Sequence, residues 1–264
     1  MKKIKIFSII LFICSAAAYA GCRIYAGAMT DHTPPVISGG DDIQVSVEDT
    51  DDKLLEGMTA EDDRDGDVTD SLVVQELSEF DDEGRRTVRY AAVDESGNVG
   101  YSTRMMEYTD YRQPVFTLNA PLRFAVGSSF NICSGIRAES SLDGDLSNNI
   151  KYTLDRAVSN SVTGTYQVEF RVMDSAGRTS YLETELEVYD PTEERIDVTL
   201  SSYLVYLRAG ESFDASDYFA ESSVEGDLEV DSTVDTGKAG TYYVDYTVTA
   251  GGQTGKSRLV VVVQ

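Results

Sequence analysis

The sequence contains few of the residues on which enzyme sites and stabilising cross-links usually depend. It has no Trp, one His and three Cys in 264 residues. Cys14 and Cys22 lie in the apolar N-terminal segment, so only Cys133 remains in the rest of the chain. One thiol forms no intramolecular disulfide, and we expect Cys133, which has apolar neighbours, to be buried as a small hydrophobic side chain.

The single histidine argues against nucleophilic or zinc catalysis. His32 lies next to a Pro-bearing joint, away from any expected core, and no second histidine is available for a zinc site. A glycosidase that uses two carboxylates stays open on residue counts, but modules of this size without insertions offer little room for a deep cleft. We therefore expect a protein that is not an enzyme and has no catalytic residues.

Basic residues are scarce relative to acidic ones. The chain has 22 Lys and Arg against 46 Asp and Glu, which gives a net charge of −24. Residues 1–30 contain four basic residues and no acidic one, so the remainder carries −28. This charge argues against nucleic acid and anionic lipid as partners. The excess of acid fits a solvated surface or, at particular turns, cation binding.

The N-terminus has the pattern of an export segment. Lys2, Lys3 and Lys5 precede an apolar run from Ile6 to Cys22. Three outcomes stay open: cleavage after Ala18-Tyr-Ala20, lipidation of Cys22 in Ala20-Gly-Cys22 although Tyr19 departs from the lipoprotein box, and retention as a membrane anchor extended by Ile24–Met29. All three place residues 31–264 outside the cytoplasm, and the basic residues agree with the positive-inside rule. We expect a single-pass anchor over residues 1–30 on the extracellular face of the cell membrane.

An internal repeat organises the rest of the chain. Glu61-Asp-Asp-Arg-Asp-Gly-Asp67 returns as Glu139-Ser-Ser-Leu-Asp-Gly-Asp145 and as Glu221-Ser-Ser-Val-Glu-Gly-Asp227, at spacings of 78 and 82 residues. A period near 80 residues is too long for a solenoid and has the size of a small domain. The repeat predicts three modules, over residues 31–110, 111–190 and 191–264.

Each module has the pattern of a β-sandwich. Short segments of alternating hydrophobicity, such as Arg86–Tyr90, Tyr166–Phe170 and Tyr242–Tyr246, are separated by Gly- and Asp-rich turns, and no long helical periodicity follows residue 30. About seven short strands in 80 residues are typical of an Ig-like architecture. We expect an all-β protein of three tandem Ig-like antiparallel β-sandwiches after an N-terminal hydrophobic helix. Short Pro-bearing joints at the module boundaries favour an extended rod.

The motifs of these modules resemble those of a known group of repeats. Pro34-Pro-Val-Ile37, the Asp-Gly-Asp turn and Tyr90-Ala-Ala-Val-Asp-Glu-Ser-Gly-Asn98 look like the bacterial Ig-like repeats of surface proteins, which are similar to hyalin-type and cadherin-like modules. The third module is the most divergent, with Ala250 where Asp94 and Asp174 stand in the others. The resemblance covers residues 31–264 and implies an exported spacer or adhesion module with no shared catalytic residues.

Two readings compete for the acidic turn of the first module. Asp63, Asp65 and Asp67 have alternate spacing and could converge on one calcium ion. However, Asp63 becomes Ser141 and Ser223, and only the Gly and the last Asp recur in all three modules, as a turn alone requires. We expect turn chemistry, with calcium at these three residues as the open alternative. Asp31, Asp110 and Asp190 lie at the joints, where a calcium-dependent rod would place its ligands.

Two further patterns have structural explanations. Ala250-Gly-Gly-Gln-Thr-Gly-Lys-Ser257 fits a relaxed phosphate-loop pattern, but a strand-like segment follows it, so we expect a hairpin turn and no nucleotide. Five tyrosines cluster in the third module and are expected to fill its core and corners, with a sugar-stacking platform as the alternative. They are Tyr203, Tyr206, Tyr242, Tyr243 and Tyr246.

Taken together, these patterns predict a non-catalytic surface stalk or adhesion protein. The alternative is a carbohydrate-binding surface module assisted by calcium. No cofactor other than calcium is expected, and the partner is an unknown protein or glycan.

Overall fold

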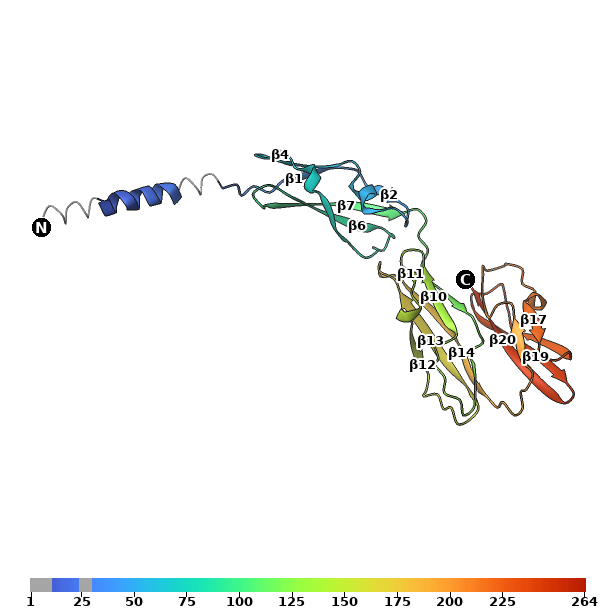
Figure 1. Cartoon of the computed structure of the whole chain (residues 1–264). Coiled ribbons are helices and arrows are strands. Elements are labelled where there is room, and N and C mark those ends of the chain that lie inside the picture. The colour runs from blue at the N-terminus through green and yellow to red at the C-terminus, as the bar shows by residue number, and fades with distance from the viewer. Residues whose placement is uncertain (1–10, 24–29) are drawn as a thin grey trace, which may run out of the picture. The chain divides into compact units, whose positions relative to one another are not determined.

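The computed structural model describes residues 11–23 and 30–264 (Figure 1). Residues 11–23 are helical, and no helix in the described part of the chain is long and apolar enough to cross a membrane. The anchor expected over residues 1–30 falls partly on residues 1–10 and 24–29, which lie outside the described residues. From residue 30 onward the chain is almost entirely strand and turn, which confirms the all-β prediction.

Three sandwiches follow one another along the chain, each made of two sheets. The first contains β1 (Val36–Gly39), β2 (Ile43–Val45), α2 (Asp51–Leu55), β3 (Met58–Asp62), β4 (Gly66–Asp67), η1 (Thr69–Ser71), β5 (Val73–Leu77), β6 (Arg86–Val93) and β7 (Val99–Tyr108). The second contains β8 (Val115–Leu118), β9 (Arg123–Ala125), β10 (Ile136–Ser140), β11 (Gly144–Asp145), η2 (Ser147–Asn149), β12 (Lys151–Leu154), β13 (Gly164–Met173) and β14 (Thr179–Tyr189). The third contains β15 (Val198–Leu200), β16 (Leu204–Leu207), η3 (Ala215–Tyr218), β17 (Phe219–Ser222), β18 (Asp227–Ser232), β19 (Gly240–Ala250) and β20 (Gln253–Val263).

The sandwiches share one topology, which departs in one respect from the prediction. Their four-stranded sheets have the orders β2-β7-β6-β5, β12-β13-β14-β9 and β16-β20-β19-β18. In each, the short second strand pairs in parallel with the last strand: β2 with β7, β9 with β14, and β16 with β20. The sheets are therefore mixed rather than purely antiparallel. The first strand of each module belongs to the smaller sheet, and the second strand belongs to the four-stranded sheet. The second strand therefore lies beside the last strand of the same module.

Alternating side chains fill three hydrophobic cores. The first is centred on Val88, Tyr90 and Met106, the second on Phe116 and Phe170, and the third on residues that include Tyr246 and Leu259. The strand residues between them point to solvent or to a neighbouring sheet, as period-2 alternation requires. Cys133 is half-buried against the second core, and burial raises the pKa of its thiol.

Contacts divide the chain into two compact units, Met1–Asp110 and Tyr111–Gln264. The second unit holds the second and third sandwiches, which pack side by side (Figure 1). Leu204 and Val260 of the third sandwich belong to the core cluster of the second. The rod expected from the short joints is therefore wrong for these two sandwiches, because apolar residues on the outer face of the third are buried against the second.

Two arginines connect the second and third sandwiches. Arg123 of β9 donates to Glu187 of its own sandwich at 2.8 Å and to Glu194, at the start of the third, at 2.7 Å. Arg258 of β20 donates to Asp245 of its own sandwich at 2.6 Å and to Glu185 of the second, also at 2.6 Å. These ion pairs lie beside the apolar contact and link the two sandwiches.

The tyrosines of the third sandwich are core and contact residues. Tyr246 is fully buried and donates a hydrogen bond to the Ala215 carbonyl at 2.6 Å. Tyr203, Tyr206 and Tyr243 pack against the core cluster of the second sandwich. Tyr242 packs against the third core and donates a hydrogen bond to the Lys238 carbonyl at 2.9 Å. These positions confirm the core and corner prediction.

The Gly-rich segment after Ala250 is a hairpin turn, as expected. Gly251 and Gly252 both have positive φ, and Ala250 pairs with Gln253 where β19 meets β20. The repeated Asp-Gly-Asp turn needs Gly for different reasons in different modules. Gly66 has φ +74°, whereas Gly226 has no positive φ and is required because a Cβ there would lie 2.5 Å from the Thr249 carbonyl oxygen.

Candidate metal centre

Five aspartates meet at one end of the first sandwich. Asp31 lies on the segment that enters β1, while Asp94 begins the turn between β6 and β7. Asp62 ends β3, and Asp63 and Asp65 belong to the turn that follows it. They form two triads: Asp31, Asp62 and Asp63, and Asp62, Asp65 and Asp94. Within each triad one carboxylate oxygen from each residue lies within 4.8 Å of the others, and Asp62 belongs to both.

The backbone of the turns holds these carboxylates in place. Asp62 Oδ1 accepts hydrogen bonds from the N–H groups of Arg64 at 2.9 Å and Asp65 at 3.0 Å, which lower the pKa of the Asp62 carboxyl. Asp65 Oδ2 accepts from the Glu95 N–H at 2.8 Å and so links the two turns. Asp94 accepts from the Asn98 backbone at 2.8 Å. The second oxygen of Asp94 also accepts, from the Asn98 side-chain amide at 2.7 Å. Hydrogen bonds within the turns thus orient Asp62, Asp65 and Asp94.

Two of the remaining oxygens have no hydrogen-bond partner. Asp31 Oδ2 and Asp62 Oδ2 are both buried and unsatisfied, and only 5% of Asp31 and 8% of Asp62 are exposed. The nearest cationic atom recorded for Asp31 is Arg64 Nε at 3.9 Å, too far for a hydrogen bond. A buried carboxylate oxygen without a partner is unfavourable, so these two oxygens are candidate ligands for a cation.

The donor set fits a hard divalent cation. Ca²⁺ binds oxygen ligands at about 2.3–2.6 Å, so two oxygens on one ion are up to about 5 Å apart. The limit of 4.8 Å within each triad satisfies this requirement. Every donor is a carboxylate oxygen, which favours Ca²⁺ over metals that prefer nitrogen or sulfur.

The second sandwich builds the same turns with serines, Ser140 and Ser141, in place of Asp62 and Asp63. Ser140 stands where Asp62 stands in the first, and its Oγ accepts from the N–H groups of Leu142 and Asp143 at 3.1 and 3.3 Å. Asp174, the counterpart of Asp94, accepts a 2.5 Å hydrogen bond from the Tyr111 hydroxyl, and burial together with this bond raises the pKa of that hydroxyl. Asp143 and Asp174 still close their turns, accepting from the N–H groups of Ser175 at 2.8 Å and Arg178 at 2.9 Å. The neutral Ser140 closes the turn that Asp62 closes in the first sandwich, so the carboxylate of Asp62 is not needed for the turn itself.

The cluster contains only two of the three residues predicted as calcium ligands. Asp63 and Asp65 belong to the cluster, but Asp67 does not. Asp67 Oδ1 accepts from the Thr69 N–H at 3.0 Å, and the hydrogen bonds from the Thr69 side chain and backbone lower the pKa of the Asp67 carboxyl. The turn role predicted for this last Asp is therefore observed.

Sequence reasoning missed Asp62 and Asp94 as candidate ligands. The sequence signal for Asp62 is that the Asp62-Asp63 pair is replaced by two serines in both other modules. Among the joint residues, Asp31 joins the cluster. Asp110 instead accepts from the Val47 N–H at 2.9 Å, and Asp190 accepts from the Thr192 N–H at 2.8 Å.

The described residues offer no catalytic arrangement around the histidine. His32 is exposed and lies one residue after Asp31, on the segment that leads into β1. Its position agrees with the expectation that it does not belong to a buried site. The aspartate cluster is thus the strongest candidate for a functional site in this sandwich.

Comparisons with known proteins identify no family. No protein-family model matches the chain, and no curated protein matches it. Among solved structures, the chain is similar to the M60 catalytic domain with the CBM51-1 and CBM51-2 domains from Clostridium perfringens ZmpB, with 12% identity and a TM-score of 0.21 over 87% of this chain. It is also similar to Drosophila N-cadherin EC1-4 (14% identity, TM-score 0.22, 78% of this chain and 63% of that one) and to mouse cadherin-23 EC22-24 (14%, 0.22, 88% and 99%).

The likenesses to ZmpB are partial in length. The chain spans 30% of that structure and 42% of a second ZmpB structure, CBM51-2 in complex with GlcNAc and INT domains, to which it is 16% identical with a TM-score of 0.23 over 87% of this chain. At such TM-scores these similarities carry no weight for function, which has to be argued from the chain's own residues.

Proposed function

We propose that this protein is a non-catalytic surface stalk or adhesion protein whose first sandwich binds Ca²⁺ where the chain enters it. Residues 1–30 hold it at the extracellular face of the membrane, and the sandwiches carry the contact surfaces outward. The observation that supports this proposal best is the pair of buried, unpartnered oxygens on Asp31 and Asp62. A cation bound by both would connect the entering segment to two turns of the sandwich.

The position of Asp31 gives the cation a mechanical role. Asp31 precedes the Pro34-Pro35 pair and β1, so it belongs to the segment that links the first sandwich to the N-terminal region. Without a cation, its described polar contacts are a 2.9 Å hydrogen bond from the Thr33 N–H and the 3.9 Å approach of Arg64. Ca²⁺ would restrain this segment and make the first joint stiffer.

Calcium titration of the full chain by calorimetry tests the site. We expect a dissociation constant of roughly 0.1–1 mM, the range of extracellular calcium modules. The decisive variant is Asp62→Ser, which introduces the residue of the second sandwich and removes the carboxylate shared by both triads. At a calcium concentration tenfold above the dissociation constant, the wild-type first sandwich should gain about 1.4 kcal/mol of stability and the variant none.

Asp67→Ser is the matched control, because it changes a carboxylate of the same turn that lies outside the cluster. It should bind calcium like the wild type. The absence of calcium binding, or an equal loss in both variants, would remove the cation from the proposal. The attachment is tested separately by the intact mass of the membrane fraction: a chain that begins at Gly21 and is free in the medium would contradict the anchor, and a diacylglycerol on Cys22 would establish a lipoprotein.

A further inference from the structure

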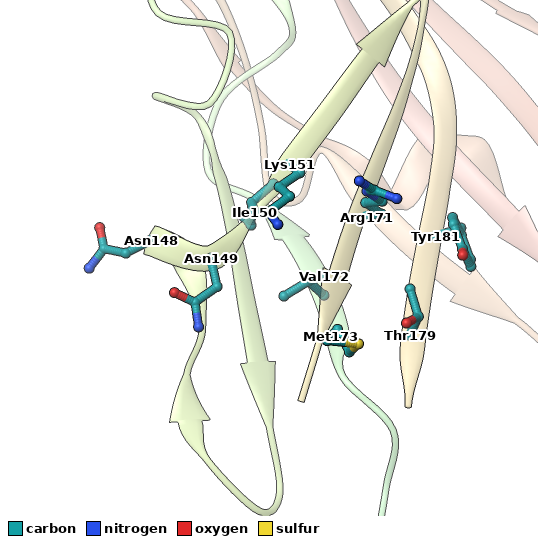
Figure 2. A pocket seen from close by; sticks show the side chains of 9 residues that line it. All are labelled: Asn148, Asn149, Ile150, Lys151, Arg171, Val172, Met173, Thr179 and Tyr181. Atoms are coloured by element: carbon teal, nitrogen blue, oxygen red, sulfur yellow. The ribbon is translucent and has the colours of Figure 1, made fainter. Parts of the chain in front are cut away.

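A cleft of about 540 Å³ lies at one end of the four-stranded sheet in the second sandwich. Figure 2 shows the side chains that line it, which come from η2 and from the neighbouring strands β12, β13 and β14. The polar side chains among them are Asn148, Asn149, Lys151, Arg171, Thr179 and Tyr181. The cleft belongs to the second sandwich alone and is separate from the aspartate cluster.

Three of these residues form a row across the sheet. Lys151 pairs with Arg171, and Arg171 pairs with Tyr181. All three are exposed, Tyr181 to 59%. Two like charges placed directly opposite each other on neighbouring strands destabilise a sheet. Within the described part of the chain neither cation has a carboxylate oxygen within 4.0 Å, although the protein has 46 acidic residues.

The internal repeat shows that the fold does not require this basic row. Arg171, at the centre of the row, lies three residues before Asp174. In the other sandwiches the corresponding residue lies three residues before Asp94 or Ala250. The counterparts are Val73, Ala91 and Tyr101 in the first sandwich and Glu229, Thr247 and Lys256 in the third. Only the second sandwich has two adjacent cations in this row. A local arrangement that costs stability and that the sibling modules lack points to a binding role.

We propose that this cleft binds an anionic saccharide, with its acidic group on Arg171 and Lys151. A guanidinium can donate two parallel hydrogen bonds to one carboxylate, and the neighbouring ammonium adds a second positive charge. The amides of Asn148 and Asn149 supply donors and acceptors for hydroxyl groups, and the exposed Tyr181 ring offers an apolar face to a sugar ring. The inference goes beyond the proposed stalk function and does not depend on calcium.

The charge of the whole chain favours a glycan with widely spaced acidic groups. Outside residues 1–30 the protein carries −28, which repels an extended polyanion. At physiological salt this repulsion is screened beyond about 8 Å, so a single carboxylate can still be attracted by the two cations of the cleft. A uronic acid flanked by neutral groups meets this requirement better than a densely charged polymer.

Calorimetric titration of the full chain with short oligosaccharides in which uronic acids alternate with neutral sugars, in the presence of a calcium chelator, tests the proposal. We expect binding that weakens as salt is raised, and an association constant at least tenfold lower in Arg171→Thr and in Lys151→Val. These variants introduce residues that the third and first sandwiches carry at the same places, so they are compatible with the fold. Tyr101→Ala on the first sandwich and Asp62→Ser in the aspartate cluster should leave binding unchanged.

Parallel titrations distinguish the chemical source of the negative charge. A sulfated oligosaccharide that binds better than the uronate would retain the anionic saccharide but assign its acidic group as a sulfate. Equal binding of a neutral oligogalactose or of a poly-glutamate peptide would overturn the proposal, the latter in favour of an acidic-peptide site. No heat at millimolar ligand, or unchanged binding in Arg171→Thr, would also overturn it. Since calcium is removed throughout, these outcomes are independent of the aspartate cluster.

Discussion

Arg123 provides the sharpest test of how the second and third sandwiches are held together. Its side chain is only 7% exposed and donates to three acceptors: Glu187 at 2.8 Å, Glu194 at 2.7 Å and the Lys256 carbonyl at 2.5 Å. Its guanidinium carbon also lies 4.8 Å from the centre of the Tyr189 ring. Replacing Arg123 with Ala removes all of these contacts and leaves two carboxylates close together without their cation.

The structure sets the expected size of this effect. Breaking a fully buried ion pair costs about 3–5 kcal/mol, because the remaining charge has no partner. Here the Glu187 side chain is 29% exposed and that of Glu194 is 14% exposed, so water can partly rehydrate both carboxylates once the arginine is gone. The lost contact with Tyr189 adds about 0.5–1 kcal/mol. We therefore expect Arg123→Ala to lower the unfolding free energy of the second unit by about 2–4 kcal/mol.

Urea unfolding followed by circular dichroism measures this change, with one transition fitted for each of the two units. Arg85→Ala is the control, because Arg85 also meets two carboxylates, those of Asp81 and Glu83, but its side chain is 41% exposed. Exposed ion pairs contribute little, so this variant should change stability only slightly. If the two variants are equally stable, the bridging ion pairs do not hold the second and third sandwiches together.

Two further substitutions test close packing and burial. Gly255→Ala should destabilise the third sandwich by about 3 kcal/mol or more in urea unfolding, because the added Cβ would clash with the Ile196 carbonyl oxygen. Gly100→Ala should destabilise the first sandwich for the same reason, because its Cβ would clash with the Pro35 carbonyl oxygen. Unchanged stability in both variants would show that these backbones can separate. Burial raises the pKa of Tyr206 to about 12, above its ordinary value near 10. The neutral form is therefore favoured in the folded state, so stability from this group is intact below pH 10 and is lost as the pH rises from 10 to 12, by about 2–3 kcal/mol. Tyr206→Phe should flatten this alkaline loss, and an unchanged pH profile would show that the hydroxyl is hydrated.

The fold could be predicted from local signals because each module repeats them. Alternation in segments such as Tyr166–Phe170 identifies strands, and the Gly and Asp residues between them identify turns. The parallel pairing of β2 with β7, or of β9 with β14, left no such signal. It depends on the chain crossing from one sheet to the other, which short strands of three residues do not reveal.

The sequence contains one indication that the second and third sandwiches pack side by side, which the regular repeat made easy to overlook. Leu259–Val263 is a continuous apolar run, and strands buried on both faces have this composition. The even-numbered Val260 and Val262 face the second sandwich, while Leu259 and Val261 face the third core. Short Pro-bearing joints favour a rod only where the outer faces are polar, and this one is not.

The candidate metal centre shows the same division. The sequence alone placed Asp63 and Asp65 in one acidic turn and Asp31 at the joint. It could not bring Asp31 and Asp94 to that turn, because each is separated from it by about thirty residues. Asp31 reaches the turn through the pairing of β1 with β3, whereas the turn of Asp94 belongs to the other sheet and reaches it across the sandwich. Nor could it show that the Asp67 carboxylate accepts a hydrogen bond from the Thr69 N–H and lies outside the cluster.

The sequence by itself determined the all-β class, the repeated module and the turns, since these depend on side-chain period and on residues adjacent along the chain. Only the tertiary structure decided which carboxylates lie close enough to share a cation and which basic side chains line one cleft. Lys151, Arg171 and Tyr181 are distant in sequence and become one row through strand register alone. A shift of one residue in either pairing would send one of these side chains to the opposite face, so the site exists only in the folded sheet.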